Sequence, residues 1–198
     1  MTETTRQRML TATAELLQER GFRGTSLNDI LEESDAPRGS IYYHFPGGKE
    51  ELALEATRLE VQGITDYLVA AFENAAGPVE AVRAYVQGAR EHTRTSGYRL
   101  GCPVASLILG GPEPLSSLAE VCRQALEEWH EIIRDGLAAG GVSDARADSL
   151  ATLILTSVEG ALIMARSRRD PAPLDTLADE LAGAVDAALE GVAGIRGR

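Results

Sequence analysis

Apolar residues recur at helical spacing along almost the whole chain, and runs that alternate apolar and polar residues, as strands do, are absent. Glycine and proline interrupt this pattern at intervals, for example at Gly77-Pro78, Gly140-Gly141 and Asp170-Pro171. The segments between the breaks predict about nine helices. We therefore expect an all-α fold with a three-helix domain over residues 1–48 and a larger helical domain over residues 49–198.

The chain has 198 residues, of which 44% are hydrophobic and 25% are charged, as is ordinary for a soluble globular protein. No apolar run approaches the roughly 20 residues that span a bilayer, and the N-terminus lacks a secretory signal pattern. The expectation is a cytoplasmic protein with no membrane partner. Cys102 and Cys122 are too few for a disulfide framework and are interpreted as reduced.

The net charge of −11 speaks against a generic nucleic-acid binder. Residues 1–50 hold six basic and eight acidic residues, a net charge of −2, and the remainder holds 13 basic and 22 acidic residues, a net charge of −9. The N-terminal part is therefore nearly neutral. Any DNA binding by this part would have to come from individually placed contacts rather than from overall attraction.

A helix-turn-helix unit is predicted near the N-terminus. The first helix is expected over 4–20 and ends at Gly21, a second begins at Thr25 or Ser26, and a third opens at Pro37 and reaches Phe45. On a helical wheel, Ile41 and Phe45 point inward to meet Leu27, Ile30 and Phe22, whereas Tyr42 and Tyr43 point outward. This geometry suits DNA, but it also recurs in proteins that bind none.

The segment GFRGTSLNDILEESDAPRGSIYYHFPGGKEEL resembles the DNA-binding domain of TetR-family transcriptional regulators. The matching points are Gly21-Phe22, Thr25-Ser26 followed by Ile30, Gly39, the run from Ile41 to Phe45, and Lys49 followed by acidic residues and Leu52. The segments GCPVA and FPGGKEEL further resemble the LmrA/YxaF-like subgroup. The resemblance implies a dimer, a palindromic operator, repression, and release of DNA by a ligand bound in the C-terminal part.

The resemblance also implies which residues contact DNA: Thr25, Ser26, Arg38, Gly39, Ser40, Tyr42, Tyr43, His44 and Lys49. Our hypothesis is that Arg38 and Tyr42 read bases while Thr25, Tyr43, His44 and Lys49 hold phosphates. Asp35 departs from the family pattern, because the turn at this position often carries glycine; aspartate tolerates a left-handed backbone better than most residues.

The C-terminal part contains no motif that names a ligand. Polar or aromatic residues in its apolar helices are the candidates for an effector site: Tyr85, His92, Tyr98, Cys102, Trp129 and Glu159. An apolar, aromatic small molecule is the expected effector, bound among the helices between residues 79 and 165. Glu159 lies in an apolar stretch and needs a partner, which is either a ligand or an internal group. Residues such as Tyr98 and Trp129 are more often core-packing residues than walls of a ligand site.

The last two helices are the predicted dimer interface, because their Ala- and Gly-rich seams allow close approach. The candidate interface residues are Leu153, Ser157, Leu177, Leu181 and Val185. The alternative is that the last helix covers its own domain.

Two other classes of protein share features with this sequence. Glu127 and His130 have the spacing of a di-iron helical bundle, but neither His44 nor His92 supplies the second such pair, so no metal, cofactor or enzymatic activity is expected. The remaining alternative is a helical small-molecule or protein-binding module without DNA binding.

Overall fold

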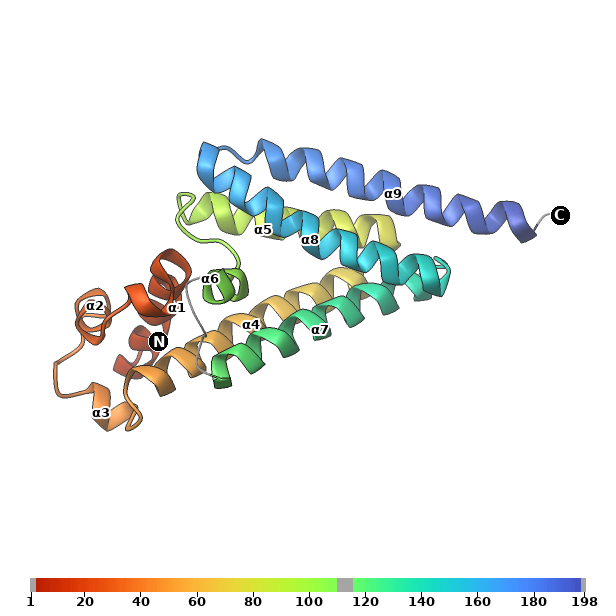
Figure 1. The fold of residues 1–198 in the computed structure, drawn as a ribbon. Helices are drawn as coiled ribbons and strands as arrows, with labels where there is room; N and C mark the ends of the chain where they lie inside the picture. The colour runs from red at the N-terminus through yellow and green to blue at the C-terminus, as the bar shows by residue number, and fades with distance from the viewer. Residues whose placement is uncertain (1–2, 110–115, 197–198) are drawn as a thin grey trace. The chain divides into compact units, whose positions relative to one another are not determined.

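The computed structural model describes residues 3–109 and 116–196, and within them the chain forms nine helices and no strand (Figure 1). The predicted all-α fold is confirmed. The helices are α1 Thr5–Gly24, α2 Leu27–Glu33, α3 Ile41–His44, α4 Lys49–Asn74, α5 Pro78–Thr95, α6 Pro103–Leu109, α7 Ser116–Ala139, α8 Asp144–Arg168 and α9 Ala172–Arg196.

Contacts divide the chain into two compact units. The first comprises residues 1–63 and 100–125, and the second comprises residues 64–99 and 126–198. The long helices α4 and α7 each contribute to both units. The domain boundary expected at residue 48 stays a prediction.

The first unit encloses an apolar core that α1, α2, α3 and α4 build together. Ile41 and Phe45 are buried in it, as the wheel predicted, and they join a cluster with the following other members: Met9, Leu10, Ala14, Leu16, Ile30, Leu52 and Ala56. Leu27 packs against this cluster at its edge. Phe22 is not a member of it, so the expectation that Phe22 meets Ile41 and Phe45 is wrong.

Polar contacts fix α1 against its neighbours in this unit. The Gln18 side-chain amide donates to the Glu60 carboxylate of α4 at 3.0 Å, and the Ser106 hydroxyl of α6 donates to the Gln18 carbonyl at 3.1 Å. The Arg6 guanidinium pairs with Glu55 and lies 5.0 Å from the centre of the Phe45 ring. Because these contacts join α1 to both α4 and α6, the three helices form one structural block.

In the second unit, α5, α8 and α9 lie side by side (Figure 1). The buried seam of α9 includes Leu174, Leu181 and Val185, which pack inside their own chain. Arg90 of α5 pairs with Asp175 of α9 at 2.6 Å, and Arg83 pairs with Asp179. The prediction that Leu181 and Val185 form the dimer interface is therefore corrected, because α5 and α8 of the same chain already cover the seam.

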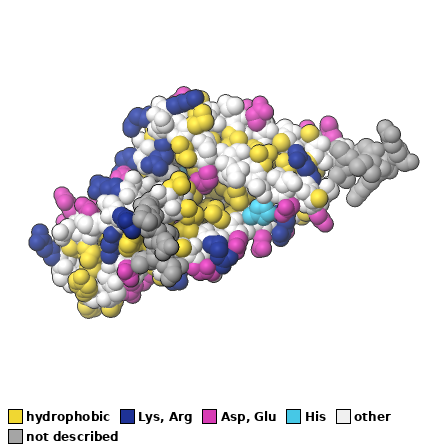
Figure 2. All heavy atoms as spheres, viewed as in Figure 1, with side chains coloured by type: hydrophobic (Ala, Val, Ile, Leu, Met, Phe, Trp, Pro, Cys, Tyr) yellow, Lys and Arg dark blue, Asp and Glu magenta, His cyan; other side chains and the backbone are white. Residues whose placement is uncertain are grey.

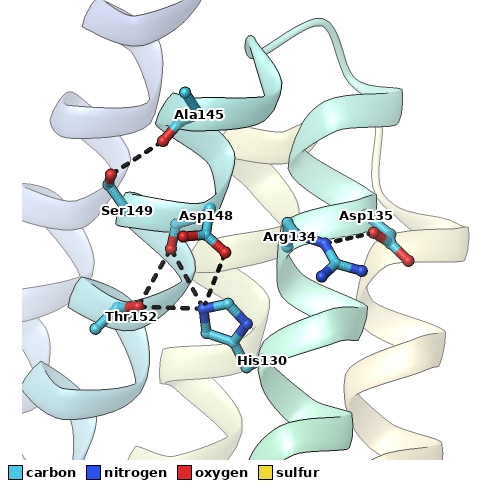
Figure 3. Close-up of polar contacts among 7 residues, drawn as sticks. All are labelled: His130, Arg134, Asp135, Ala145, Asp148, Ser149 and Thr152. Atoms are coloured by element: carbon cyan, nitrogen blue, oxygen red, sulfur yellow. Dashed lines mark hydrogen bonds and ion pairs between the residues drawn. The ribbon is translucent and has the colours of Figure 1, made fainter.

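A polar cluster joins α7 to α8 (Figure 3). The His130 Nε2 atom lies 3.1 Å from the Thr152 hydroxyl and 3.3 Å from the Asp148 carbonyl oxygen, and 3.8 Å from an Asp148 carboxylate oxygen. The described residues contain no group of three His, Cys, Asp or Glu side chains that could hold a metal ion. His130 is thus accounted for as a packing contact between helices.

Helix α8 departs from its prediction. Its apolar sequence favoured burial on all sides, but Leu153, Ile163 and Met164 are 43%, 59% and 45% exposed. By length and composition alone, α8 is long and apolar enough to cross a membrane. Core helices of soluble proteins meet the same criterion. Its other apolar positions, Ile154 and Val158 among them, are buried in the second unit. One face of α8 is therefore apolar and uncovered in the single chain.

The substitution Gly136→Ala in α7 should destabilise the second unit. A Cβ atom there would stand 2.2 Å from Cδ1 of Phe72 and 2.7 Å from its Cγ, so the ring would have to move. We expect overpacking to lower the free energy of unfolding by about 1–3 kcal/mol. The better helix propensity of alanine should offset about 1 kcal/mol of this loss. Urea unfolding followed by circular dichroism measures this change.

The matched control is Gly63→Ala in α4, where a Cβ would meet no atom within 4 Å. That variant should gain up to about 1 kcal/mol from helix propensity alone. Equal effects of the two alanines would contradict the close packing of Phe72 on Gly136.

Candidate nucleic-acid interface

The turn between α2 and α3 is held by α1. Arg8 donates through Nε to the Ser34 carbonyl at 2.9 Å and through Nη2 to the Asp35 carbonyl at 3.2 Å. Asp35 adopts a φ of 47°, the left-handed conformation expected of it. The sequence reading missed Arg8, because its two acceptors are backbone carbonyls 26 and 27 residues away that no motif reveals. Arg8 therefore orients α3 relative to the rest of the unit.

Helix α3 is shorter than predicted. Pro37 opens a turn rather than a helix: both the Ser40 backbone N–H and the Ser40 hydroxyl donate to the Pro37 carbonyl, at 2.9 and 2.6 Å. Helical hydrogen bonding begins only at Ile41 and ends at His44. The turn that follows depends on Gly48, whose φ of 66° favours glycine.

The outward side of this segment presents aromatic rings. Tyr42 and Tyr43 are 64% and 82% exposed, and His44 is half-buried with its ring 4.9 Å from that of Tyr43 in an edge-to-face arrangement. Gly39 is exposed, and a Cβ added to it would meet no atom within 4 Å. We define the α3 surface as Arg38, Gly39, Tyr42, Tyr43 and His44. It is open to solvent and offers rings, hydroxyls and one guanidinium.

Three predicted contact residues are occupied within the chain. Thr25 is buried, with 1% of it exposed, and its hydroxyl donates to the Gly21 carbonyl at 2.9 Å. The Ser26 hydroxyl donates to the Asp29 carboxylate at 2.6 Å, and the Ser40 hydroxyl is engaged with Pro37. The predicted phosphate contact of Thr25 is corrected on this ground, since its side chain is buried and its proton already committed.

Ser26 instead closes a capping box at the start of α2. Its hydroxyl accepts from the Asp29 N–H at 3.1 Å, while the Asp29 carboxylate accepts from the Ser26 N–H at 2.8 Å. The two hydrogen bonds from Ser26 hold the pKa of Asp29 below its usual 3.8, and the charges of Arg20 and Lys49 add to this effect. The box therefore favours the charged form of the Asp29 carboxylate.

The substitution Ser26→Ala should lower the free energy of unfolding by about 1 kcal/mol at pH 7, as loss of a helix cap usually does. Because the folded pKa of Asp29 is lowered, the box contributes above about pH 4 and is lost as the pH falls through the lowered value. The loss of stability between pH 7 and pH 3 should therefore be smaller in the variant than in the wild type. Urea midpoints at pH 7 and pH 3 test this, with Thr95→Ala, an exposed hydroxyl within α5, as the control.

The cationic side chains of this region differ in whether they have a partner within the chain. Arg20 lies 3.8 Å from Asp29, and the Lys49 ammonium lies 4.1 Å from the centre of the Phe22 ring. Arg38 is exposed, and across the described ranges it has no hydrogen bond, ion pair or ring contact. On the face shown in Figure 2, Lys and Arg side chains are scattered among acidic ones rather than gathered in one patch. This distribution fits placed contacts rather than a broad basic surface.

The six effector candidates are not gathered in one compact unit. Cys102 is buried in the first unit, whereas the others belong to the second. Tyr85 and Trp129 are buried there, and the Trp129 indole N–H donates to the Thr65 hydroxyl at 2.9 Å. The Tyr98 ring is half-buried under the Arg169 guanidinium at 5.9 Å, and His92 is exposed. His92 therefore does not face the interior of its unit.

Two further predictions concern partners and reactivity. Glu159 is half-buried and takes part in an interaction within the chain, as a carboxylate in an apolar stretch requires. Cys102 and Cys122 are both free and buried, and burial raises the pKa of the Cys122 thiol to about 11. The thiolate of Cys122 is therefore scarce at neutral pH.

The remaining candidates for the dimer interface differ in exposure. Ser157 and Leu177 are half-buried, and only Leu153 is exposed.

The geometry defines a helix-turn-helix protein with an exposed aromatic surface after its turn. Comparison with known proteins specifies the family. Residues 9–56 match the bacterial regulatory proteins of the tetR family, and residues 78–180 match the C-terminal domain of LmrA/YxaF-like transcriptional regulators. The chain belongs to the TetR family of DNA-binding transcriptional regulators, in its LmrA/YxaF-like branch, and not to an enzyme family.

Individual relatives agree over most of their length. An uncharacterized HTH-type transcriptional regulator of Mycobacterium tuberculosis is 34% identical over 181 residues, which cover 89% of this chain and 91% of the relative. LmrA of Bacillus subtilis, an HTH-type transcriptional regulator, is 32% identical over 85% of this chain and 90% of its own. A TetR regulator of known structure from Chloroflexus aurantiacus is 28% identical, with a TM-score of 0.79 over 92% of this chain and 94% of that one.

Proposed function

We propose that this regulator is a homodimeric repressor that binds a palindromic operator and is released by a small apolar or aromatic effector. The observation that carries the proposal is the α3 surface, where Tyr42 and Tyr43 are exposed to solvent while Ile41 and Phe45 of the same segment are buried. A large exposed aromatic pair is costly to leave in water and suits a surface that contacts a partner. The structure of the TetR-family regulator CifR with a 26-bp double-strand operator offers a precedent within the shared fold.

In the proposed complex, Arg38 and Tyr42 face base edges, while Tyr43, His44 and Lys49 face phosphates. An exposed guanidinium without an internal partner is free to donate two hydrogen bonds to guanine, and a tyrosine ring suits the methyl group of thymine. Tyrosine hydroxyls and an imidazole N–H suit phosphate oxygens. Thr25, Ser26 and Ser40 act by holding the turn and the helix cap.

Dimerisation supplies the second half of the operator contact. Leu153, Ile163 and Met164 expose apolar side chains on one face of α8, and a Cβ at Gly160 would meet nothing within 4 Å. The exposed residues of α8 between Ser149 and Met164 carry no charge. A second copy of the chain would bury this face in an isologous interface, and two recognition surfaces would then meet half-sites about one DNA turn apart.

Effector binding is proposed for the C-terminal part, where Tyr85 and Trp129 provide buried aromatic surface. The ligand would favour one of two dimer states over the other and so change operator affinity. Because α4 contributes to both compact units, it is the segment through which a change in the second unit reaches Lys49.

Titration of a labelled DNA fragment from upstream of the protein's own gene, beside a scrambled fragment at near-physiological salt, tests the proposal. Selective binding by a dimer, reversed by apolar or aromatic compounds, is the expected result. Failure here and in selection from a random DNA pool would favour a helical binding module without DNA binding. Selective binding that no effector reverses would refute only the ligand response.

The substitution Gly39→Leu should separate folding from DNA binding. The position is exposed and open, so we expect an unchanged urea midpoint. The larger side chain would hold the α3 surface away from the DNA and weaken operator affinity by about 10-fold or more, the loss of at least one base contact. Undiminished affinity would show that Gly39 does not face the DNA closely.

A further inference from the structure

The aromatic ring of Phe22 has a place that its sequence context does not reveal. Gly21 has a φ of 68° and a ψ of 176°, which break α1 three residues before its end. The break turns Phe22 away from the apolar stripe of α1, and its ring is half-buried outside the core cluster. The Lys49 ammonium lies over this ring, 4.1 Å from its centre. A residue of the last turn of α1 thus meets the first residue of α4.

Lys49 gains little from its own helix. A cation at a helix N-terminus opposes the helix dipole, and Glu50 and Glu51 occupy the same turn. Throughout the described residues, its ammonium has no hydrogen bond and no ion pair. Burial lowers the pKa of Lys49, and the nearby Asp29 carboxylate opposes that shift. The charge is therefore held by a ring face and a neighbouring carboxylate, with all three N–H donors unused.

We propose that Phe22 is a positioning residue for operator binding, whose ring holds the Lys49 ammonium in place to receive a DNA phosphate. A lysine on a flexible four-carbon stem loses rotamer freedom when it binds, and prior placement on a ring reduces that loss. A ring face attracts a cation without occupying its donors, unlike a carboxylate partner. This role rests on the proposed function, in which Lys49 contacts a phosphate of the operator.

The plain alternative is that Phe22 and Lys49 only cover each other, as apolar rings and lysine stems often do. The alternative predicts that loss of the ring affects stability but leaves the salt dependence of DNA binding unchanged. Positioning predicts loss of a phosphate contact, which appears as a smaller slope of log affinity against log salt. The two roles thus differ in a measurable quantity.

The first arm of the test uses the fact that Lys49 is the only lysine in the chain. Protein labelled with ¹³C-lysine gives one side-chain signal set, read without DNA. Wild type and Phe22→Tyr should show an upfield ring-current shift at the ε-methylene group, and Phe22→Leu should lose it. A wild-type signal at the position of free lysine would overturn the proposal.

The second arm measures affinity for the operator fragment across a salt series. Phe22→Leu should bind about 5- to 30-fold more weakly, since each protomer loses one cation–π contact, and its salt slope should fall by up to about two. Phe22→Tyr should remain close to wild type. Weaker binding of Phe22→Leu with an unchanged slope would overturn positioning in favour of a structural role.

Lys49→Gln asks the same question without altering the ring. Its loss of affinity should match that of Phe22→Leu, and the double variant should be no worse than either; additive losses would overturn the proposal. If wild type shows no selective DNA binding, the proposed function fails and the positioning role with it, whereas the lysine signal would still report the ring contact by itself.

Discussion

Replacing Ile163 with glutamate is expected to convert the regulator into a monomer and to weaken operator binding on the order of 100-fold or more. Ile163 is 59% exposed on the uncharged face of α8. In an isologous interface the same patch lies on both sides, so each substitution acts twice. Burial of one isoleucine contributes about 1.5–3 kcal/mol, and a buried unpaired carboxylate adds a further penalty.

Sedimentation velocity at micromolar concentration and operator titration measure the two effects on the same samples. Leu59→Glu is the matched control, because Leu59 is a similarly exposed apolar residue, 54% exposed, on α4 rather than α8. That variant should remain a dimer. If Ile163→Glu also remains a dimer with normal affinity, the exposed face of α8 is not the interface.

The exposed apolar face of α8 illustrates a limit of helical periodicity. The sequence of α8 is apolar on nearly all sides. This pattern predicts that the helix is buried, but it does not show whether the same chain or a partner covers it. Ile154 and Val158 face the chain's own core, whereas Ile163 and Met164 face outward. A single sequence does not separate these faces, because a partner copy and the same chain bury the same kinds of side chain. For the same reason the sequence alone does not distinguish Leu181 and Val185, which lie buried within their own chain, from residues of a dimer interface.

Around the turn, short-range physics was sufficient for most of the prediction. The spacing of Ile41 and Phe45 placed them inside and left Tyr42 and Tyr43 outside, and Asp35 adopted the expected backbone. The roles of Arg8 and Phe22 were not accessible, because they depend on contacts with backbone carbonyls or a side chain distant in sequence. The hydrogen-bond partners of hydroxyl groups were the least predictable. Of the two adjacent candidates, Ser26 caps α2, whereas the Thr25 hydroxyl donates to the Gly21 carbonyl.

Nearby backbone acceptors explain why these hydroxyl groups are not available to a ligand. A hydroxyl next to unpaired backbone groups usually finds an acceptor within its own segment before it meets a ligand. Thr25 and Ser40 both donate to carbonyls three or four residues earlier in the chain. Long cationic side chains and rings that face solvent are free of this competition. The DNA contacts are therefore expected to reside in Arg38, the two tyrosines, His44 and Lys49.

Replacing Arg38 with alanine is expected to cost about 1–3 kcal/mol of operator affinity in each half-site and to relax sequence preference at one base position. Arg38 is exposed, while Arg8 is bound to the turn and Arg20 lies 3.8 Å from Asp29. It is thus the guanidinium of the α3 surface that can donate to guanine at no internal cost. The variant should fold normally, because it loses no contact within the described residues.

Selection of binding sites from a random DNA pool, performed with wild type and Arg38→Ala, distinguishes base reading from phosphate contact. Loss of preference at one symmetric pair of positions would identify the base that Arg38 reads. Lys49→Ala provides the contrast: it should weaken all sequences alike and reduce the salt slope by about one per half-site. If Arg38→Ala behaves in that same uniform way, Arg38 contacts the backbone, and base reading must then be assigned to the tyrosines of α3.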